Sequence, residues 1–134
     1  MKKKIVTSFL LIAVVAAIPF FTFGPKYFDT SMNRVTEIGR RNGLIGIGLW
    51  ETAVCGTDAK ATAQSIKYVA DKIGVDKVAL GSDFDGALTT HFDVTGLPLI
   101  YEALKNEGFN NKEVEIIMGG NVREFLLRNL PGSN

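Results

Sequence analysis

Residues 77–86 read KVALGSDFDG, an apolar run that leads directly into two aspartates. An earlier run, LIGIGLW at residues 44–50, is almost continuously apolar, which is typical of a strand buried on both faces. Between these runs, residues 58–73 carry apolar side chains at helical spacing, and Gly74 follows as a typical helix stop. Because a helix between two strands brings the chain back in the same direction, the sequence predicts an α/β fold with two parallel strands.

Helix signals also flank this unit. Ser31 has the chemistry of an N-cap for a helix running to about Arg41, and Asn42 with Gly43 is a left-handed stop. We therefore predict a helix from Ser31 to Arg41.

The C-terminal third is predicted to be helical. Pro98 opens a helix that ends at Gly108. Two later pairs have the spacing of a capping box, namely Asn110 with Glu113 and Asn121 with Glu124.

Composition limits the class of protein. The chain has 134 residues, a formal net charge of +1 and one cysteine, Cys55, so it forms one small domain without an internal disulfide. Lys and Arg do not cluster beyond the N-terminus, so we predict no nucleic-acid partner. We expect Cys55 to be buried as a small apolar side chain.

The N-terminus has the pattern of a membrane-targeting segment. An apolar stretch at residues 5–23 follows three lysines at positions 2–4, and it is long enough to cross a bilayer. We predict a signal anchor or signal peptide at residues 1–28, with Ala16-Ala17 as an alternative cleavage region. The positive-inside rule then places the α/β domain, residues 29–134, at the cell membrane on its outer, periplasmic or extracellular side.

The two aspartates that follow the second strand are the candidate site. In parallel α/β folds ligands bind at the carboxyl ends of strands, where Asp83 and Asp85 stand. A carboxylate there can ligate a cation, accept a proton or hold an ammonium group, but Asp residues also shape turns, and the spacing alone does not decide. His91 and Asp93 follow in the same loop, and one histidine cannot complete a three-histidine zinc site.

Several motifs together carry a resemblance. GSDFDG at residues 81–86 is followed by TGLPLIYEALKNEGFNNKEVEIIMGGNVREFL at 95–126, and RNGLIGIGL stands earlier at 41–49. Over residues 36–131 the chain resembles the end of the renal or membrane dipeptidase family of zinc metallopeptidases. FGPKYFDTSMNRV, at residues 23–35, is similar to the membrane-proximal start of bacterial members.

The resemblance implies the C-terminal portion of a (β/α)8 TIM-type barrel that hydrolyses dipeptides with water activated by two zinc ions. Asp83 matches the family aspartate that contacts the bridging water and the amino group of the dipeptide substrate. Asp85 matches the second aspartate of the motif and would have a supporting role, and Gly81 and Gly86 would give the loop room.

The chain also departs from the family pattern. The His, Asp and Glu residues that ligate zinc in the family have no counterparts here, so no metal ligand is assigned. A full barrel needs about 250 residues, so the chain resembles an internally deleted member, and the sequence leaves open whether it is active or inactive alone. The alternative to a metallodipeptidase is a non-catalytic, membrane-anchored remnant or a partner of a full-length dipeptidase, and assembly of several copies as a homo-oligomer is a further way to complete the site.

A third choice is a phosphatase of the haloacid dehalogenase type. In that family an apolar strand is followed by D-x-D-G-x-x-T, so Asp83 would be the nucleophile and Asp85 the general acid. Gly81 and Ser82 before the first aspartate do not resemble that family's strand, which makes the dipeptidase the preferred interpretation.

Overall fold

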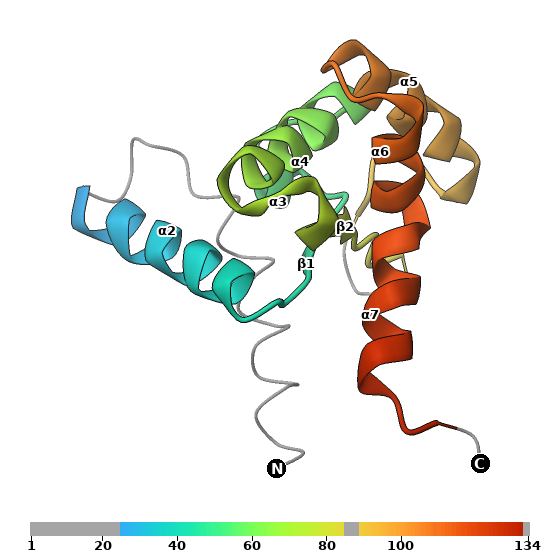
Figure 1. Ribbon diagram of the computed structural model, residues 1–134. Coiled ribbons are helices and arrows are strands. Elements are labelled where there is room, and N and C mark those ends of the chain that lie inside the picture. Colours follow the sequence, from blue (N-terminus) through green and yellow to red (C-terminus); the bar gives the residue numbers. More distant parts are fainter. Residues whose placement is uncertain (1–24, 85–88, 133–134) are drawn as a thin grey trace.

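The computed structural model describes residues 25–84 and 89–132, with side chains from residue 33 onward (Figure 1). Its elements, in chain order, are α2 (Pro25–Arg40), β1 (Ile45–Ile47), α3 (Glu51–Val54), α4 (Ala59–Ile73), the 3-10 turn η2 (Val75–Lys77), β2 (Val78–Leu80), the 3-10 turn η3 (Val94–Gly96), α5 (Leu97–Asn106), α6 (Asn111–Glu115), the π-helical turn η4 (Ile116–Gly120) and α7 (Asn121–Asn129).

The predicted parallel pair is confirmed. β1 and β2 form a two-stranded parallel sheet within the described residues, with Ile45 beside Val78 and Ile47 beside Leu80. Each strand has only three residues, shorter than the apolar runs that predicted it. The chain is therefore an α/β protein, and two parallel strands with their helices are compatible with part of a barrel.

α4 connects the two strands, and its ends are determined by local sequence. Asp58 caps the N-terminus, because its Oδ1 accepts a hydrogen bond of 2.8 Å from the Ala61 amide. Gly74, with φ of 100°, ends the helix in a conformation that other residues rarely adopt. The face that α4 turns toward the sheet is apolar, and its buried members include Ala63, Ile66 and Val69.

The predicted start of the first helix is wrong, whereas its end is confirmed. α2 begins at Pro25, six residues before Ser31, so Ser31 lies within the helix and is not its cap. Proline at a first helical position is a start signal of its own, because its ring presets φ to the helical value. Asn42 has φ of 54°, and the Gly43 amide donates to the Ile38 carbonyl at 2.9 Å, which closes the helix.

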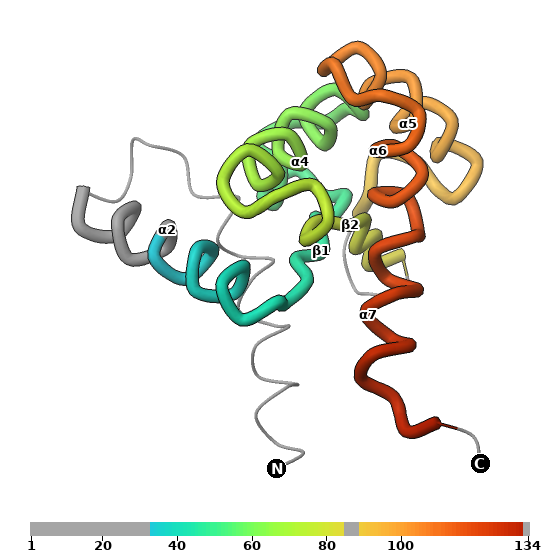
Figure 2. Tube along the Cα trace, in the orientation of Figure 1, coloured from blue at the N-terminus to red at the C-terminus, as the bar shows by residue number. Residues whose placement is uncertain are grey.

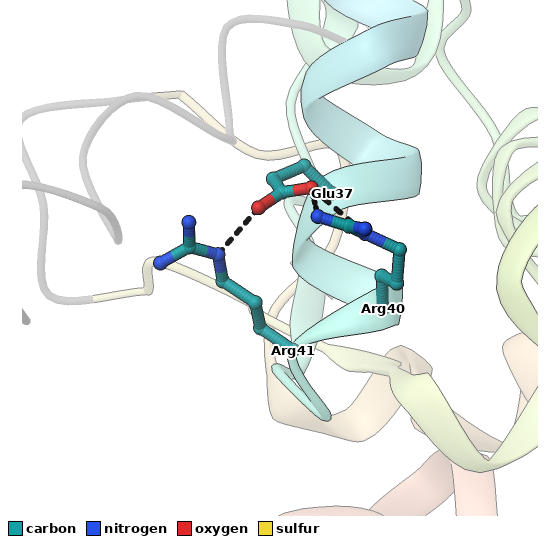
Figure 3. A network of polar contacts seen from close by, with 3 residues as sticks. All are labelled: Glu37, Arg40 and Arg41. Atoms are coloured by element: carbon teal, nitrogen blue, oxygen red, sulfur yellow. Dashed lines mark hydrogen bonds and ion pairs between the residues drawn. The ribbon is translucent and has the colours of Figure 1, made fainter.

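Three charged side chains form a network on the last turns of α2 (Figure 3). The Glu37 carboxylate accepts hydrogen bonds from Arg41 Nε at 2.5 Å and from Arg40 Nη2 at 2.7 Å. These bonds, from Arg41 first and then Arg40, lower the pKa of the Glu37 carboxyl. All three side chains are exposed to solvent, so the network stabilises the helix end only weakly.

One of the two predicted capping boxes is confirmed. Asn110 Oδ1 accepts a hydrogen bond of 3.0 Å from the Glu113 amide, and Glu113 Oε2 accepts one of 2.8 Å from the Asn110 amide. The preceding helix, α5, has Pro98 in its first turn and is followed by Gly108 with φ of 95°, as predicted. Local sequence therefore determines this connection.

The second predicted capping box, at Asn121, is wrong. The chain kinks at Gly119, but Gly120 and Asn121 both have helical backbone angles, so Asn121 lies inside the helix and is not an N-cap. Its side chain is buried, and Nδ2 donates to the carbonyl oxygens of Val75 at 2.7 Å and Val78 at 2.8 Å. The amide therefore joins α7 to the amino end of β2, a tertiary contact that competes with capping.

The prediction for Cys55 is also wrong. Cys55 is exposed and has φ of 55°, and its amide donates to the Glu51 carbonyl at the end of α3. A residue that ends a four-residue helix in the left-handed conformation projects from the turn, which keeps its side chain out of the core.

The predicted membrane segment at residues 5–23 lies outside the described residues. None of the helices in the described ranges is long and apolar enough to cross a membrane.

Candidate functional site

The carboxyl ends of β1 and β2 lie at the same edge of the sheet because the strands are parallel. The Gly81 amide donates to the Ile47 carbonyl at 2.8 Å, which extends the pairing one residue beyond β2. Trp50 follows β1 at this edge and Asp83 follows β2. The two loops that leave the strands therefore start side by side.

Glycine allows the two chains to approach closely at this edge. A Cβ atom on Gly81 would lie 3.1 Å from the Gly46 carbonyl carbon and 3.2 Å from its Cα. Directly after β1, a Cβ at Gly48 would lie 1.9 Å from a carbon of the Trp50 ring, so the indole occupies that space. Of the two glycines predicted to give the loop room, Gly81 lies within the described residues, and it packs directly against the Gly46 backbone.

Asp83 is exposed and adopts the left-handed conformation, with φ of 59°. Asp tolerates this region better than most residues, but it still costs free energy relative to extended backbone. Backbone strain of this kind occurs often at functional sites, where the surrounding structure maintains it. The backbone at the end of β2 thus presents the Asp83 carboxylate to solvent.

The other loop residues differ in their environment. Asp85 and Gly86 lie outside the described residues. His91 is exposed, whereas Asp93 caps η3, because its Oδ1 accepts hydrogen bonds from the Thr95 hydroxyl at 2.6 Å and the Thr95 amide at 2.8 Å. The hydroxyl first and the amide second lower the pKa of the Asp93 carboxyl. Asp93 therefore has a structural role.

The sequence matches the family described as "Membrane dipeptidase (Peptidase family M19)" over residues 29–127, a range that contains both strands and Asp83. The chain belongs to the membrane dipeptidase family. The resemblance seen in the sequence motifs is thereby confirmed.

Individual dipeptidases support this membership. Dipeptidase verJ of Clonostachys rogersoniana is 34% identical over 78 residues, 52% of this chain and 20% of the relative. Dipeptidase tcpJ of Claviceps purpurea is 38% identical over 75 residues, 50% of this chain and 17% of the relative. Dipeptidase ataJ of Aspergillus terreus is 33% identical over 98 residues, 67% of this chain and 24% of the relative.

The matched part of this membrane dipeptidase family member thus spans between 17% and 24% of the length of these curated relatives. No solved structure matches the chain.

The described residues of this membrane dipeptidase family member do not fit a two-zinc centre. In residues 25–84 and 89–132, no three His, Cys, Asp or Glu side chains lie close enough together to hold a metal ion. The sequence has one histidine, the exposed His91. The donor set that two zinc ions need is therefore not formed by these residues.

Sequence reasoning did not single out Trp50 or assign the tertiary role of Asn121. Trp50 is partly buried, and its ring lies against Gly48. The sequence signal for this contact was a tryptophan at the end of an apolar run that contains glycine. Asn121 acts at the opposite, amino end of β2, whereas its spacing to Glu124 indicated only a helix cap.

Proposed function

We propose that this chain takes part in dipeptide hydrolysis and that the Asp83 carboxylate binds the free amino group of the dipeptide. The match to the membrane dipeptidase family, which includes Asp83 at the carboxyl end of β2, is the observation that carries the proposal. The same match favours this interpretation over a phosphatase of the haloacid dehalogenase type.

The chemistry of Asp83 suits this role. The amino group of a peptide has a pKa near 8 and is mostly an ammonium cation at neutral pH, so a carboxylate attracts it and accepts its hydrogen bonds. The side chain is exposed, so a substrate reaches it without displacing buried groups. A carboxylate in this position also accepts and returns a proton during peptide cleavage.

The resemblance implies two zinc ions, but the described residues do not fit such a centre. We therefore assign Asp83 a role toward the substrate and none toward a metal. We propose that a hydrolytically competent site obtains its remaining groups from outside the described residues. We also propose that β1 and β2, which pair in parallel, are two neighbouring strands of a (β/α)8 barrel.

Hydrolysis of a dipeptide mixture by the purified full chain in mild detergent, with and without added zinc, tests this function. We expect Asp83→Asn to lower turnover by at least about ten-fold, because the neutral amide loses the charge that binds the ammonium group. Asp76→Asn is the matched control, since Asp76 is an exposed aspartate at the amino end of β2. Equal turnover in the two variants would refute the role of Asp83.

The second candidate is a non-catalytic, membrane-anchored partner of a longer dipeptidase. The absence of a metal-binding group among the residues that the structure describes supports this candidate. Zinc content measured on the purified chain distinguishes the two, because a partner without ligands retains no stoichiometric zinc.

For localisation, we propose that residues 1–28 anchor the chain in the cell membrane, with the domain on the outer side. The lysines before the apolar stretch support this orientation. We expect the chain to resist carbonate extraction and its domain to be cleaved by protease added outside intact cells. Release by carbonate, or protection of the domain, would contradict the proposal.

A further inference from the structure

Side chains alternate between two environments along β1 and the residues directly after it. Every second residue belongs to the hydrophobic core and is only 2% exposed, namely Ile45, Ile47 and Leu49. Successive side chains of an extended chain point to opposite faces, so Gly46, Gly48 and Trp50 share the other face. The backbone of Trp50 is itself extended, with φ of −118° and ψ of 157°. Trp50 therefore stands at the carboxyl end of a glycine face, which is the face of β1 opposite the core.

The chain that leaves β2 passes over the same face. β1 and β2 lie side by side (Figure 2), and a Cβ atom on Gly46 would lie 3.3 Å from Gly81 Cα. Gly81 thus runs along the glycine face, and Asp83 follows two residues later. Trp50 and Asp83 each stand three residues beyond the last register pair of the sheet. Since neighbouring strands are about 4.8 Å apart, the two loops start within reach of one small ligand.

The indole of Trp50 folds back over Gly48. A Cβ atom on Gly48 would lie 1.9, 2.5 and 2.6 Å from three carbons of the six-membered ring, Cζ3, Cη2 and Cε3. Glycine leaves room for the ring at this position, where a larger residue would not. Part of the indole thus rests on backbone, while Trp50 as a whole keeps some of its surface in contact with solvent. The strand edge therefore presents a flat, apolar surface beside the loop that carries Asp83.

We propose that Trp50 determines the substrate preference of this chain by packing its indole against the side chain of the first residue of the dipeptide, and that this side chain is large and apolar. The inference rests on the proposed function, since it requires the Asp83 carboxylate to bind the amino group. An aromatic ring buries much apolar surface of a ligand in one contact. A carboxylate in that place would lose water and meet the negative face of the ring.

The geometry of a dipeptide selects its first residue for this contact. The first side chain leaves the carbon atom that carries the ammonium group, so the two groups bind within about 4 Å of each other. This distance is close to the spacing of about 4.8 Å between the strands that carry Asp83 and Trp50. The second side chain of an extended dipeptide points to the opposite side, away from the indole.

Leu-Gly and Gly-Leu test the inference, because they contain the same atoms and differ only in the position of the leucine. Trp50 is the single tryptophan of the sequence, so its fluorescence reports contact with a ligand directly. Each dipeptide is titrated to about 10 mM, well above ordinary Michaelis constants, into the full chain in mild detergent without added zinc. We expect Leu-Gly to change the Trp50 emission and to bind at least about five-fold more tightly than Gly-Leu.

Substitutions show which residue causes the preference. Calorimetry on Trp50→Ala should show that the preference for Leu-Gly is lost. Tyr101→Ala is the control, because it removes an exposed aromatic ring from α5, and it should retain the preference. Asp83→Asn should weaken the binding of both dipeptides to the same extent. The fluorescence comparison uses the native chain, so it decides the matter even where Trp50→Ala fails to fold.

The outcomes separate this inference from the proposed function. Equal binding of Leu-Gly and Gly-Leu that still depends on Asp83 would overturn the role of Trp50 alone. Tighter binding of Leu-Gly without a change in Trp50 emission would overturn it as well. Binding of neither dipeptide would overturn the role of Asp83, and the inference with it.

Discussion

Replacing Asn121 by alanine removes the side chain that joins α7 to β2. In the native protein Nδ2 donates two hydrogen bonds, to the Val75 carbonyl at 2.7 Å and the Val78 carbonyl at 2.8 Å. Asn121 is 7% exposed, so water does not readily replace the lost amide. We expect Asn121→Ala to destabilise the fold strongly.

The size of the loss follows from the bonds. Each hydrogen bond contributes about 0.5–1.5 kcal/mol, and a buried carbonyl left without a partner costs about 1–3 kcal/mol. The Val78 carbonyl is the buried one of the two, so one such penalty applies in full. The expected decrease in the free energy of unfolding is therefore roughly 2–4 kcal/mol.

Urea unfolding of the full chain in mild detergent, followed by the fluorescence of Trp50, measures this difference. Asn129→Ala is the matched control, because Asn129 lies on the same helix and its Nδ2 donates to the Phe125 carbonyl at 2.7 Å in an exposed position. We expect the control to remain within about 0.5 kcal/mol of the native chain. Equal losses in the two variants would refute the role assigned to the buried amide.

Two further predictions concern the loop and the strand edge. Thr95→Ala should raise the pKa of Asp93 toward its usual value, because the hydroxyl that lowers it is removed, and carboxyl NMR titration measures the change. Since the native pKa is lowered, the stability that Asp93 contributes is present above pH about 4 and is lost as the pH falls through its folded value. Gly81→Ala should lower the free energy of unfolding by about 1–3 kcal/mol, because its Cβ would press on the Gly46 backbone. Gly132→Ala is the control, and it should leave thermal unfolding unchanged because the space around Gly132 is open. A neutral Gly81→Ala, or an unchanged Asp93 pKa, would contradict these assignments.

Local signals predicted the elements whose ends are determined by neighbouring residues. Asp58 and Gly74 delimit α4, and the Asn110 and Glu113 pair forms the predicted capping box. The parallel pairing also followed from sequence, because a helix between two strands permits little else. These features depend on residues a few positions apart, which the sequence displays directly.

The wrong predictions involve contacts between distant segments or competing signals. Asn121 has the same cap spacing as Asn110, but its amide binds carbonyls more than forty residues earlier, which no local pattern reveals. At α2, Pro25 and Ser31 are both start signals, and the helix begins at the earlier one. Cys55 was assigned to the core by residue type, whereas its left-handed backbone turns it outward.

The candidate site was predicted in part. Sequence placed Asp83 after the second strand, where the structure has it, but its left-handed φ could not be read from an Asp in a loop. Its catalytic role stays a prediction, and Asp85 and Gly86 lie outside the described residues. The close approach of Gly81 to Gly46 depends on strand register, which is a property of the assembled sheet.

The bond from Asn121 to Val78 joins residues 43 positions apart, and this separation has a consequence for biosynthesis. Ribosomes deliver the chain from its N-terminus, so β1, α4 and β2 emerge while the asparagine is still unmade. The nascent sheet therefore waits, with the Val78 carbonyl facing water or a chaperone, until the codon for Asn121 is translated. A premature stop codon before position 121 would release a product whose strands never receive that amide.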